Sequence, residues 1–251
     1  MRLKNIFPSD GFKNVVFDCD STLTYVEGAD ELAKLKGLGR EVSKITHQGM
    51  NGEITFAQSL YQRLSLLRPS KKDIEHIYQL YRENLVEDVE ELVEALRFLK
   101  KEVFIITGGY QLAVERLGKF LRIGKSNIFG VRLKFGKNED FVGVQKGHLT
   151  ANGGKAKMVS KISKTGPTVL VGDGVTDLEA KESVDLFVGF GGVIERDVVK
   201  RNSEVYVKAR SLAFILPLVC NREESIKIKK SKFKNLYLKG YNTLIRLTAE
   251  R

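Results

Sequence analysis

The residues best suited to chemistry are aspartates that follow short apolar runs. Asp18 and Asp20 come after the run 14–17, and Asp173 comes shortly after the run 168–171. Clustered carboxylates repel one another, and burial raises their pKa unless a cation offsets the charge. A hard divalent ion such as Mg²⁺ offsets it by binding one or two carboxylates, waters and a substrate phosphate oxygen. The aspartates therefore predict a magnesium site that handles phosphate.

Two of these aspartates could act as the nucleophile and the acid–base group of phosphoryl transfer. Asp18, held ionised, would act as a carboxylate nucleophile. Asp20 lies on the same side of an extended chain, because side chains alternate along a strand. It would act as general acid for the leaving oxygen and later as base for the hydrolytic water. The pair predicts a reaction through an aspartyl-phosphate.

A second polar strand end predicts an anion site. Thr107 offers a hydroxyl, and the amides of Gly108 and Gly109 precede a predicted helix whose N-terminus attracts anions. Glycine there lets the backbone approach a phosphate closely. Lys155, expected in a loop with Gly153–Gly154, offers the cation for the transferring group.

Parallel strands would bring these residues together. Short apolar runs predict strands at 14–17, 102–106, 168–171, 186–188 and 205–207. Helical patterns at 89–99 and 112–121 lie between them, which is typical of an α/β fold with a doubly wound parallel sheet. Ligands bind such sheets at the carboxyl ends of the strands, where the polar residues are found.

The stretch 25–87 departs from this alternation because it contains no convincing strand. Its apolar residues recur at helical spacing, and Ser70 followed by Asp73 predicts a capped helix start. A helical insert at this point would lie over the carboxyl edge of the sheet. The expected parts are a catalytic core of residues 1–24 and 88–221, a helical cap domain of residues 25–87, and a tail of residues 222–251. A β-hairpin is also predicted within 132–144.

Composition limits the class of protein. The chain has 251 residues, of which 42% are hydrophobic and 29% charged, and this excludes a disordered or low-complexity chain. Cys19 and Cys220 make no disulfide framework. No signal peptide or membrane-spanning stretch is recognised, so a cytoplasmic setting is expected.

The positive charge is concentrated near the end of the chain. From Arg222 onward there are nine basic and three acidic residues, so +6 of the formal net charge of +11 lies there and +5 lies before it. The catalytic part is therefore not expected to bind nucleic acid. The segment from Arg222 predicts a basic amphipathic helix, although Gly240 argues against one continuous helix because it costs about 1 kcal/mol relative to Ala. Such a helix could bind a membrane surface, an acidic partner or RNA, or dock on its own domain or on a second copy in a homodimer.

In chain order, these motifs resemble the haloacid-dehalogenase-like phosphohydrolases. The matching residues are Asp18–Thr22, Thr107–Gly109, Lys155 and Gly172–Asp177. The segments 27–33 and 187–192 narrow the resemblance to the phosphoserine phosphatase branch. The resemblance covers about Val15 to Pro217 and implies a core with a helical cap. It also implies hydrolysis of O-phospho-L-serine to L-serine and phosphate, a step of serine biosynthesis.

The resemblance assigns roles to individual residues. It implies Asp18 as nucleophile and Asp20 as proton donor. It implies that Mg²⁺ is held by Asp18, the Asp20 backbone carbonyl and Asp173, with Asp177 supporting the metal's water shell. The phosphoryl group would be held by Thr107, Gly108, Gly109 and Lys155. Glu27 would meet the substrate ammonium and Arg63 its carboxylate, and the pocket would be bounded by Met50, Gly52, Thr176 and Arg196.

Two other functions stay open. The same chemistry could act on another small phosphomonoester, or transfer the phosphoryl group to an alcohol instead of water. Alternatively, the chain could be a binding protein that works through its tail and keeps a vestigial site. Thr107, where the family usually has Ser, keeps the hydroxyl and adds a methyl group.

Overall fold

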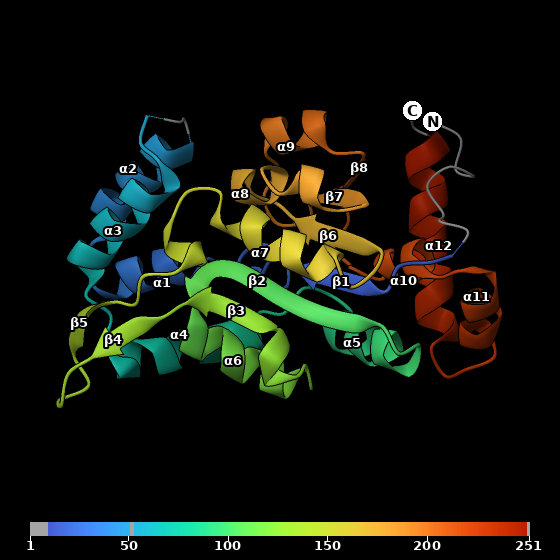
Figure 1. Ribbon diagram of the computed structural model, residues 1–251, viewed down its shortest axis with the longest axis horizontal. Helices are drawn as coiled ribbons and strands as arrows, with labels where there is room; N and C mark the ends of the chain where they lie inside the picture. Colours follow the sequence, from blue (N-terminus) through green and yellow to red (C-terminus); the bar gives the residue numbers. More distant parts are fainter. Residues whose placement is uncertain (1–9, 51–52, 250–251) are drawn as a thin grey trace.

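The computed structural model describes residues 10–50 and 53–249, and within them six parallel strands form one sheet in the order β3-β2-β1-β6-β7-β8 (Figure 1). The strands are β1 (Asn14–Phe17), β2 (Glu102–Tyr110), β3 (Ile128–Val131), β6 (Thr168–Gly172), β7 (Leu186–Phe190) and β8 (Val205–Val207). The strands expected from the sequence are all confirmed. The edge strand β3 was missed, because it is short and contains Gly130, a residue depleted from strands.

Helices cover both faces of the sheet, as a doubly wound fold requires. The helices α5 (Val89–Phe98) and α6 (Gln111–Phe120) lie on one face, and α7 (Gly154–Ser163) and α8 (Val175–Leu178) lie on the other (Figure 1). The central strands β1 and β6 are buried along their whole length. This double burial explains why their sequences are apolar throughout rather than alternating. Beyond α8, the short helix α9 (Asp197–Asn202) precedes β8.

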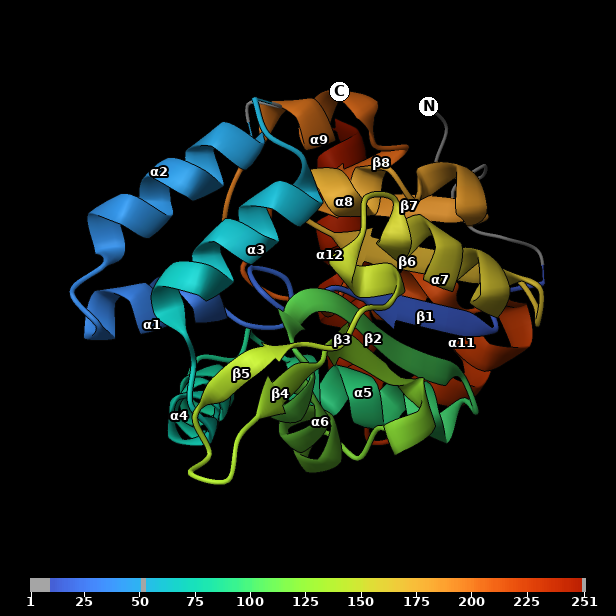
Figure 2. The same cartoon turned by 60° about the vertical axis from the view of Figure 1, so that its left-hand side comes forward.

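The segment between β1 and α5 is helical in its described residues. Its helices are α1 (Gly28–Leu35), α2 (Gly39–Met50), α3 (Phe56–Leu67) and α4 (Lys71–Glu83). The expected cap at the start of α4 is present, because Ser70 and Asp73 each accept a hydrogen bond from the other's backbone amide. Thr24 and Leu85 pair in an isolated antiparallel bridge, so the segment leaves and rejoins the sheet layer at neighbouring points. Figure 2 shows α2 and α3 packed side by side beyond the strand ends.

The predicted hairpin is confirmed, and it contacts the helical segment. Strand β4 (Leu133–Phe135) pairs antiparallel with β5 (Phe141–Val144). The guanidinium of Arg68, which ends α3, donates to the Phe141 carbonyl oxygen over 3.1 Å. The Lys71 ammonium at the start of α4 lies 3.0 Å from the Glu139 carboxylate. The hairpin therefore contacts the segment between α3 and α4.

The chain after Cys220 folds onto its own sheet domain. Residues 222–249 form α11 (Arg222–Lys229) and α12 (Lys234–Ala249), which lie at the opposite end of the sheet from α2 and α3 (Figure 1). The apolar side of α12 packs on α10 (Ile215–Val219) and buries Leu236, Tyr237 and Leu244. Phe233, just before α12, is also buried and lies against the ring of Phe98 in α5. No helix in the described ranges combines the length and the apolar character that crossing a membrane requires.

Gly240 does not interrupt α12, although its low helix propensity argues against a continuous helix there. A Cβ at this position would lie 2.1 Å from the carbonyl oxygen of Ala213. Glycine therefore lets α12 approach the backbone before α10 more closely than any other residue could. The packing gained in this way outweighs the helix-propensity cost that motivated the expectation.

Candidate active site

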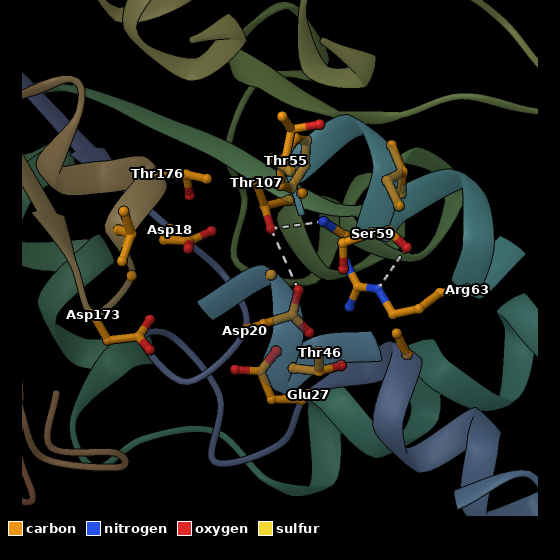
Figure 3. A pocket seen from close by; sticks show the side chains of 18 of the residues that line it. Asp18, Asp20, Glu27, Thr46, Thr55, Ser59, Arg63, Thr107, Asp173 and Thr176 are labelled. Carbon is orange, nitrogen blue, oxygen red and sulfur yellow. Dashed lines mark hydrogen bonds between the residues drawn. The ribbon is translucent and has the colours of Figure 1, made fainter. Parts of the chain in front are cut away.

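A cavity of about 520 Å³ lies between the carboxyl ends of the central strands and the helical segment (Figure 3). From the sheet side it is lined by Asp18, Asp20, Thr107, Gly108, Gly109, Asp173 and Thr176. From the helical segment it is lined by residues that include Glu27, Thr46, Ser59, Arg63 and Tyr81. In Figure 3, Asp18 and Asp173 lie on one side, Arg63 and Ser59 on the other, and Asp20 between them. The cavity therefore brings together residues from distant parts of the sequence.

Lys155 is buried between two of the aspartates. Its Nζ lies 3.0 Å from Oδ2 of Asp18 and donates to Oδ1 of Asp177 over 2.7 Å. Burial alone would lower the pKa of Lys155, but the charges of Asp177 and Asp18 outweigh burial and raise that pKa above its usual value. Lys155 is thus a permanent cation beside Asp18.

Lys155 belongs to the first turn of α7, and its expected place in a loop was wrong. Gly153 takes a left-handed conformation, with φ of 63°, at the cap of this helix. A Cβ on the next residue, Gly154, would lie 1.7 Å from the His148 carbonyl oxygen. The glycines that suggested a loop therefore allow a tight helix start, which directs Lys155 towards the strand ends.

Three buried carboxylates lie close enough together to hold a metal ion. Asp18, Asp173 and Asp177 each offer an oxygen atom, and these oxygens lie within 4.8 Å of one another. Burial and the charge of Asp18 raise the pKa of Asp173 to about 6, and the same two causes raise the pKa of Asp177. A buried set of anionic oxygen donors suits a hard divalent cation, so these residues fit a metal ion.

Asp20 is held by donors from the helical segment and does not join this cluster. Its Oδ1 accepts from the Tyr81 hydroxyl over 2.6 Å and from the Gly28 amide over 2.7 Å. Its Oδ2 lies 3.4 Å from Oγ1 of Thr107. Removal from solvent raises the pKa of Asp20, although both donors to Oδ1 act against that rise. A carboxyl group with a raised pKa is suited to giving and taking a proton.

The end of β2 supplies the expected anion-binding residues. Thr107, Gly108 and Gly109 all line the cavity, and the Gly109 amide donates to Oγ1 of Thr107 over 3.0 Å. A Cβ on Gly109 would lie 2.7 Å from Oδ2 of Asp20. Glycine is therefore required where the strand passes the Asp20 carboxylate.

Glu27 and Arg196 form a charged network beside the cluster of aspartate carboxylates described above. Oε1 of Glu27 accepts from the Ser21 hydroxyl over 2.7 Å and lies 3.6 Å from the Arg196 guanidinium. The same guanidinium lies 3.2 Å from Oδ2 of Asp173. Burial, followed by the charges of Asp20 and Asp173, raises the pKa of Glu27 to about 8. A cationic ligand group nearby would therefore stabilise the ionised form of Glu27.

Two of the remaining expected pocket residues line the cavity, and two lie at or beyond the limit of the part of the chain that the structure describes. Arg63 lines the cavity, and its Nε donates to the Ser59 carbonyl oxygen over 3.4 Å. Thr176 also lines the cavity, at the start of α8. The side chain of Met50 and the whole of Gly52 lie outside the described residues.

Sequence reasoning missed several cavity residues. Tyr81 lies on the buried face of α4 with Ile74 and Ile77, yet its hydroxyl donates to Asp20. Oγ1 of Thr46 is buried without a hydrogen-bond partner among the described residues. Ser59 is one helical turn before Arg63 and lies on the same wall. That spacing was the available signal for Ser59, whereas nothing in the helical pattern distinguished Tyr81 from a core residue.

Comparisons with known proteins agree with this geometry. Residues 12–185 match the model of the haloacid dehalogenase-like hydrolases. The phosphoserine phosphatase of Bos taurus is 39% identical over 209 residues, covering 82% of this chain and 92% of that protein. A substrate-bound phosphoserine phosphatase complex has a TM-score of 0.72 at 27% identity, covering 83% of this chain and 98% of that one. A phospho-aspartyl intermediate analogue of phosphoserine phosphatase has a TM-score of 0.71 at 28% identity, covering 84% and 100%.

Proposed function

The chain belongs to the haloacid dehalogenase-like hydrolases, and we propose that it hydrolyses O-phospho-L-serine to L-serine and phosphate. The names of its phosphoserine phosphatase relatives support this substrate. The observation that carries this proposal is the division of labour within one cavity. Asp18 and Asp20 line this cavity at the strand ends, and the buried Lys155 ammonium lies 3.0 Å from the Asp18 carboxylate. Glu27 and Arg63 line the same cavity from the helical segment. The first group handles a phosphoryl ester, and the second complements an ammonium and a carboxylate.

The reaction proceeds in two steps on this chain's residues. Asp18 attacks phosphorus, the bond between phosphorus and the serine oxygen breaks, and Asp20 gives its proton to that oxygen. Water then attacks the aspartyl-phosphate, Asp20 takes a proton from that water, and phosphate leaves. Lys155 enters the reaction charged, because the carboxylates of Asp18 and Asp177 hold the proton on it.

The metal ion in this proposal is Mg²⁺. Asp18, Asp173 and the backbone carbonyl of Asp20 would hold it, and Asp177 would support its water shell. When bound, Mg²⁺ supplies positive charge that offsets the carboxylates and the phosphoryl oxygens. The all-oxygen donor set of the cluster supports this choice over a softer metal.

The two ends of the substrate would meet different residues. Thr107, Gly108 and Gly109 would hold the phosphoryl oxygens together with Lys155. Glu27 would accept from the ammonium, and the planar guanidinium of Arg63 would pair with the carboxylate. Met50, Gly52, Thr176 and Arg196 would bound the pocket.

We also propose that residues 25–87 act as a cap over a core of residues 1–24 and 88–221, with residues 222–251 as a tail. A contact between the two parts supports the cap, since the Ala57 amide at the start of α3 donates to Oδ1 of Asn152, a cavity-lining residue just before the Lys155 helix, over 3.0 Å. The free thiols of Cys19 and Cys220 support a reducing, cytoplasmic setting.

Phosphate release with and without Mg²⁺ tests the proposal. We expect phosphoserine to be hydrolysed faster than phosphoethanolamine, which has the ammonium and lacks the carboxylate. In Arg63→Ala, kcat/KM on phosphoserine should fall by roughly 10- to 100-fold, since a charged hydrogen-bonded pair is lost. The preference for phosphoserine over phosphoethanolamine should then largely disappear. Equal rates on both substrates in the wild-type protein would point to another phosphomonoester. A phosphate ester formed with an added alcohol would point to a phosphotransferase.

A further inference from the structure

Tyr81 places a polar group inside the core beside the proton-transfer residue. Its side chain is fully buried on α4, and its hydroxyl donates to Oδ1 of Asp20 over 2.6 Å. A buried tyrosine hydroxyl normally finds a partner, because leaving it unpaired costs stability. Here the partner is the carboxylate that faces the cavity.

Glycines make room for this contact. A Cβ on Gly28 would lie 2.5 Å from the Tyr81 hydroxyl oxygen. A Cβ on Gly109 would lie 3.1 Å from the same oxygen and 2.7 Å from Oδ2 of Asp20. Three separate elements, α1, α4 and β2, therefore enclose the Asp20 carboxyl group at close range.

The two oxygens of Asp20 are consequently not equivalent. Oδ1 accepts from both the Tyr81 hydroxyl and the Gly28 amide, so its lone pairs are engaged. Oδ2 is directed towards Thr107, on the side where the phosphoryl group would bind. Both donors to Oδ1 belong to the helical segment between β1 and α5, which means that this segment sets the orientation of a residue on the sheet edge.

We propose that Tyr81 is a positioning residue that turns Oδ2 of Asp20 towards the oxygen that links phosphorus to serine. This inference rests on the proposed function, since it assigns the orientation of the residue that protonates the leaving group. The proton then transfers from Oδ2, and Oδ1 stays bound to the helical segment through both steps. Without the Tyr81 hydroxyl, Asp20 would keep the Gly28 contact but could rotate away from the leaving oxygen.

Tyr81→Phe tests the proposal because it removes only the hydroxyl group. We expect kcat on phosphoserine to fall by roughly 10-fold or more, with KM changed less than about 3-fold, since binding of the substrate does not depend on Asp20 orientation. Tyr78→Phe is the matched control. Tyr78 lies one turn earlier on α4 and packs its ring under the Arg116 guanidinium, so its hydroxyl should not matter for turnover.

The leaving group separates positioning from general damage. Acetate leaves phosphorus without needing a proton, so kcat/KM of Tyr81→Phe on acetyl phosphate should stay within about 3-fold of the wild-type value. A damaged cavity would lower kcat/KM equally on both substrates, and that result would overturn the proposal. So would an unchanged kcat on phosphoserine.

A double-mutant cycle gives a second, independent readout. In the Asp20→Asn background, adding Tyr81→Phe should change the residual kcat by less than about 2-fold, because the hydroxyl acts through Asp20. Additive losses would overturn the proposal. Failure of the wild-type protein to hydrolyse phosphoserine would instead refute the proposed substrate. The alkyl phosphate that the wild-type protein hydrolyses fastest would then replace phosphoserine in the same cycle.

Discussion

The carboxyl edge of the sheet and the helices α11 and α12 are both rich in charge, but they use it differently. At the sheet edge the charges are buried and face one another, as in the contacts of Lys155 with Asp18 and Asp177. On the terminal helices the lysines are exposed. Some lie over aromatic rings, as Lys227 lies over Phe98, and others meet carboxylates near the surface, as Lys239 meets Glu87. Surface pairs of this kind contribute little to stability.

The sources of stability differ in the same way. The sheet edge holds carboxylates whose pKa is raised by burial, including Asp173 and Glu27, so ionising them works against the fold. The terminal helices are fastened by buried apolar side chains and by the Lys101–Glu224 ion pair, in which the lysine is largely buried. A count of charges cannot reveal this contrast, because +6 of the +11 lies in the region without the catalytic cavity.

The largest expected effect comes from removing the nucleophile at the sheet edge. Asp18→Asn should lower turnover of phosphoserine by at least about 10⁴-fold, because an amide oxygen cannot form the aspartyl-phosphate. The fold should remain, since Asn keeps the size of Asp and Lys155 still pairs with Asp177. Phosphate release and a thermal melt of the same preparation measure both.

Asp197→Asn is the matched control for this change. Asp197 is an exposed carboxylate on α9 that faces Arg201, so its loss should leave turnover unchanged. Metal-dependent turnover retained in Asp18→Asn would show that another group attacks phosphorus.

The grouping of the residues at the sheet edge could be predicted because the carboxyl ends of parallel strands lie at one edge of the sheet. Asp18, Thr107 and Asp173 each follow an apolar run, so the fold class alone was enough to place them together. Tyr81 and Gly240 could not be predicted in this way. Their roles depend on how one helix lies against another element, which the pattern of a single helix does not contain.

The second prediction concerns the stability of the terminal helices. Propensity alone says that Gly240→Ala should stabilise α12 by about 1 kcal/mol. The clash of the new Cβ with Ala213 predicts the opposite, a loss of about 1–3 kcal/mol and a lower Tm, because the two backbones must separate. Turnover below the melting transition should not change, since α3, which lines the cavity, and α12 lie at opposite ends of the sheet.

Asn242→Ala controls for helix propensity in the same helix. Asn242 is exposed on α12, so replacing it should leave Tm unchanged or raise it slightly. If Gly240→Ala raised Tm as Asn242→Ala does, the close contact of α12 with the backbone at Ala213 would be refuted.

The smallest effect tests whether buried charge at the sheet edge works against the fold. Below a pH of about 4.5, Glu27 is protonated in both the folded and the unfolded chain. Between that pH and the folded pKa of about 8, the folded chain binds a proton that the unfolded chain has lost, so stability falls as pH rises through 8.

Glu27→Gln mimics the protonated form and should escape this loss. Without metal, its Tm should match the wild-type value near pH 5 and exceed it by about 2 °C or more at pH 8.5, as roughly 1 kcal/mol gives for a chain of this size. Glu223→Gln, at an exposed site on α11, should show no such divergence. If the Tm of Glu27→Gln and the Tm of the wild-type protein changed with pH in the same way, ionised Glu27 would not destabilise the fold. The contrast between the sheet edge and the terminal helices would then fail.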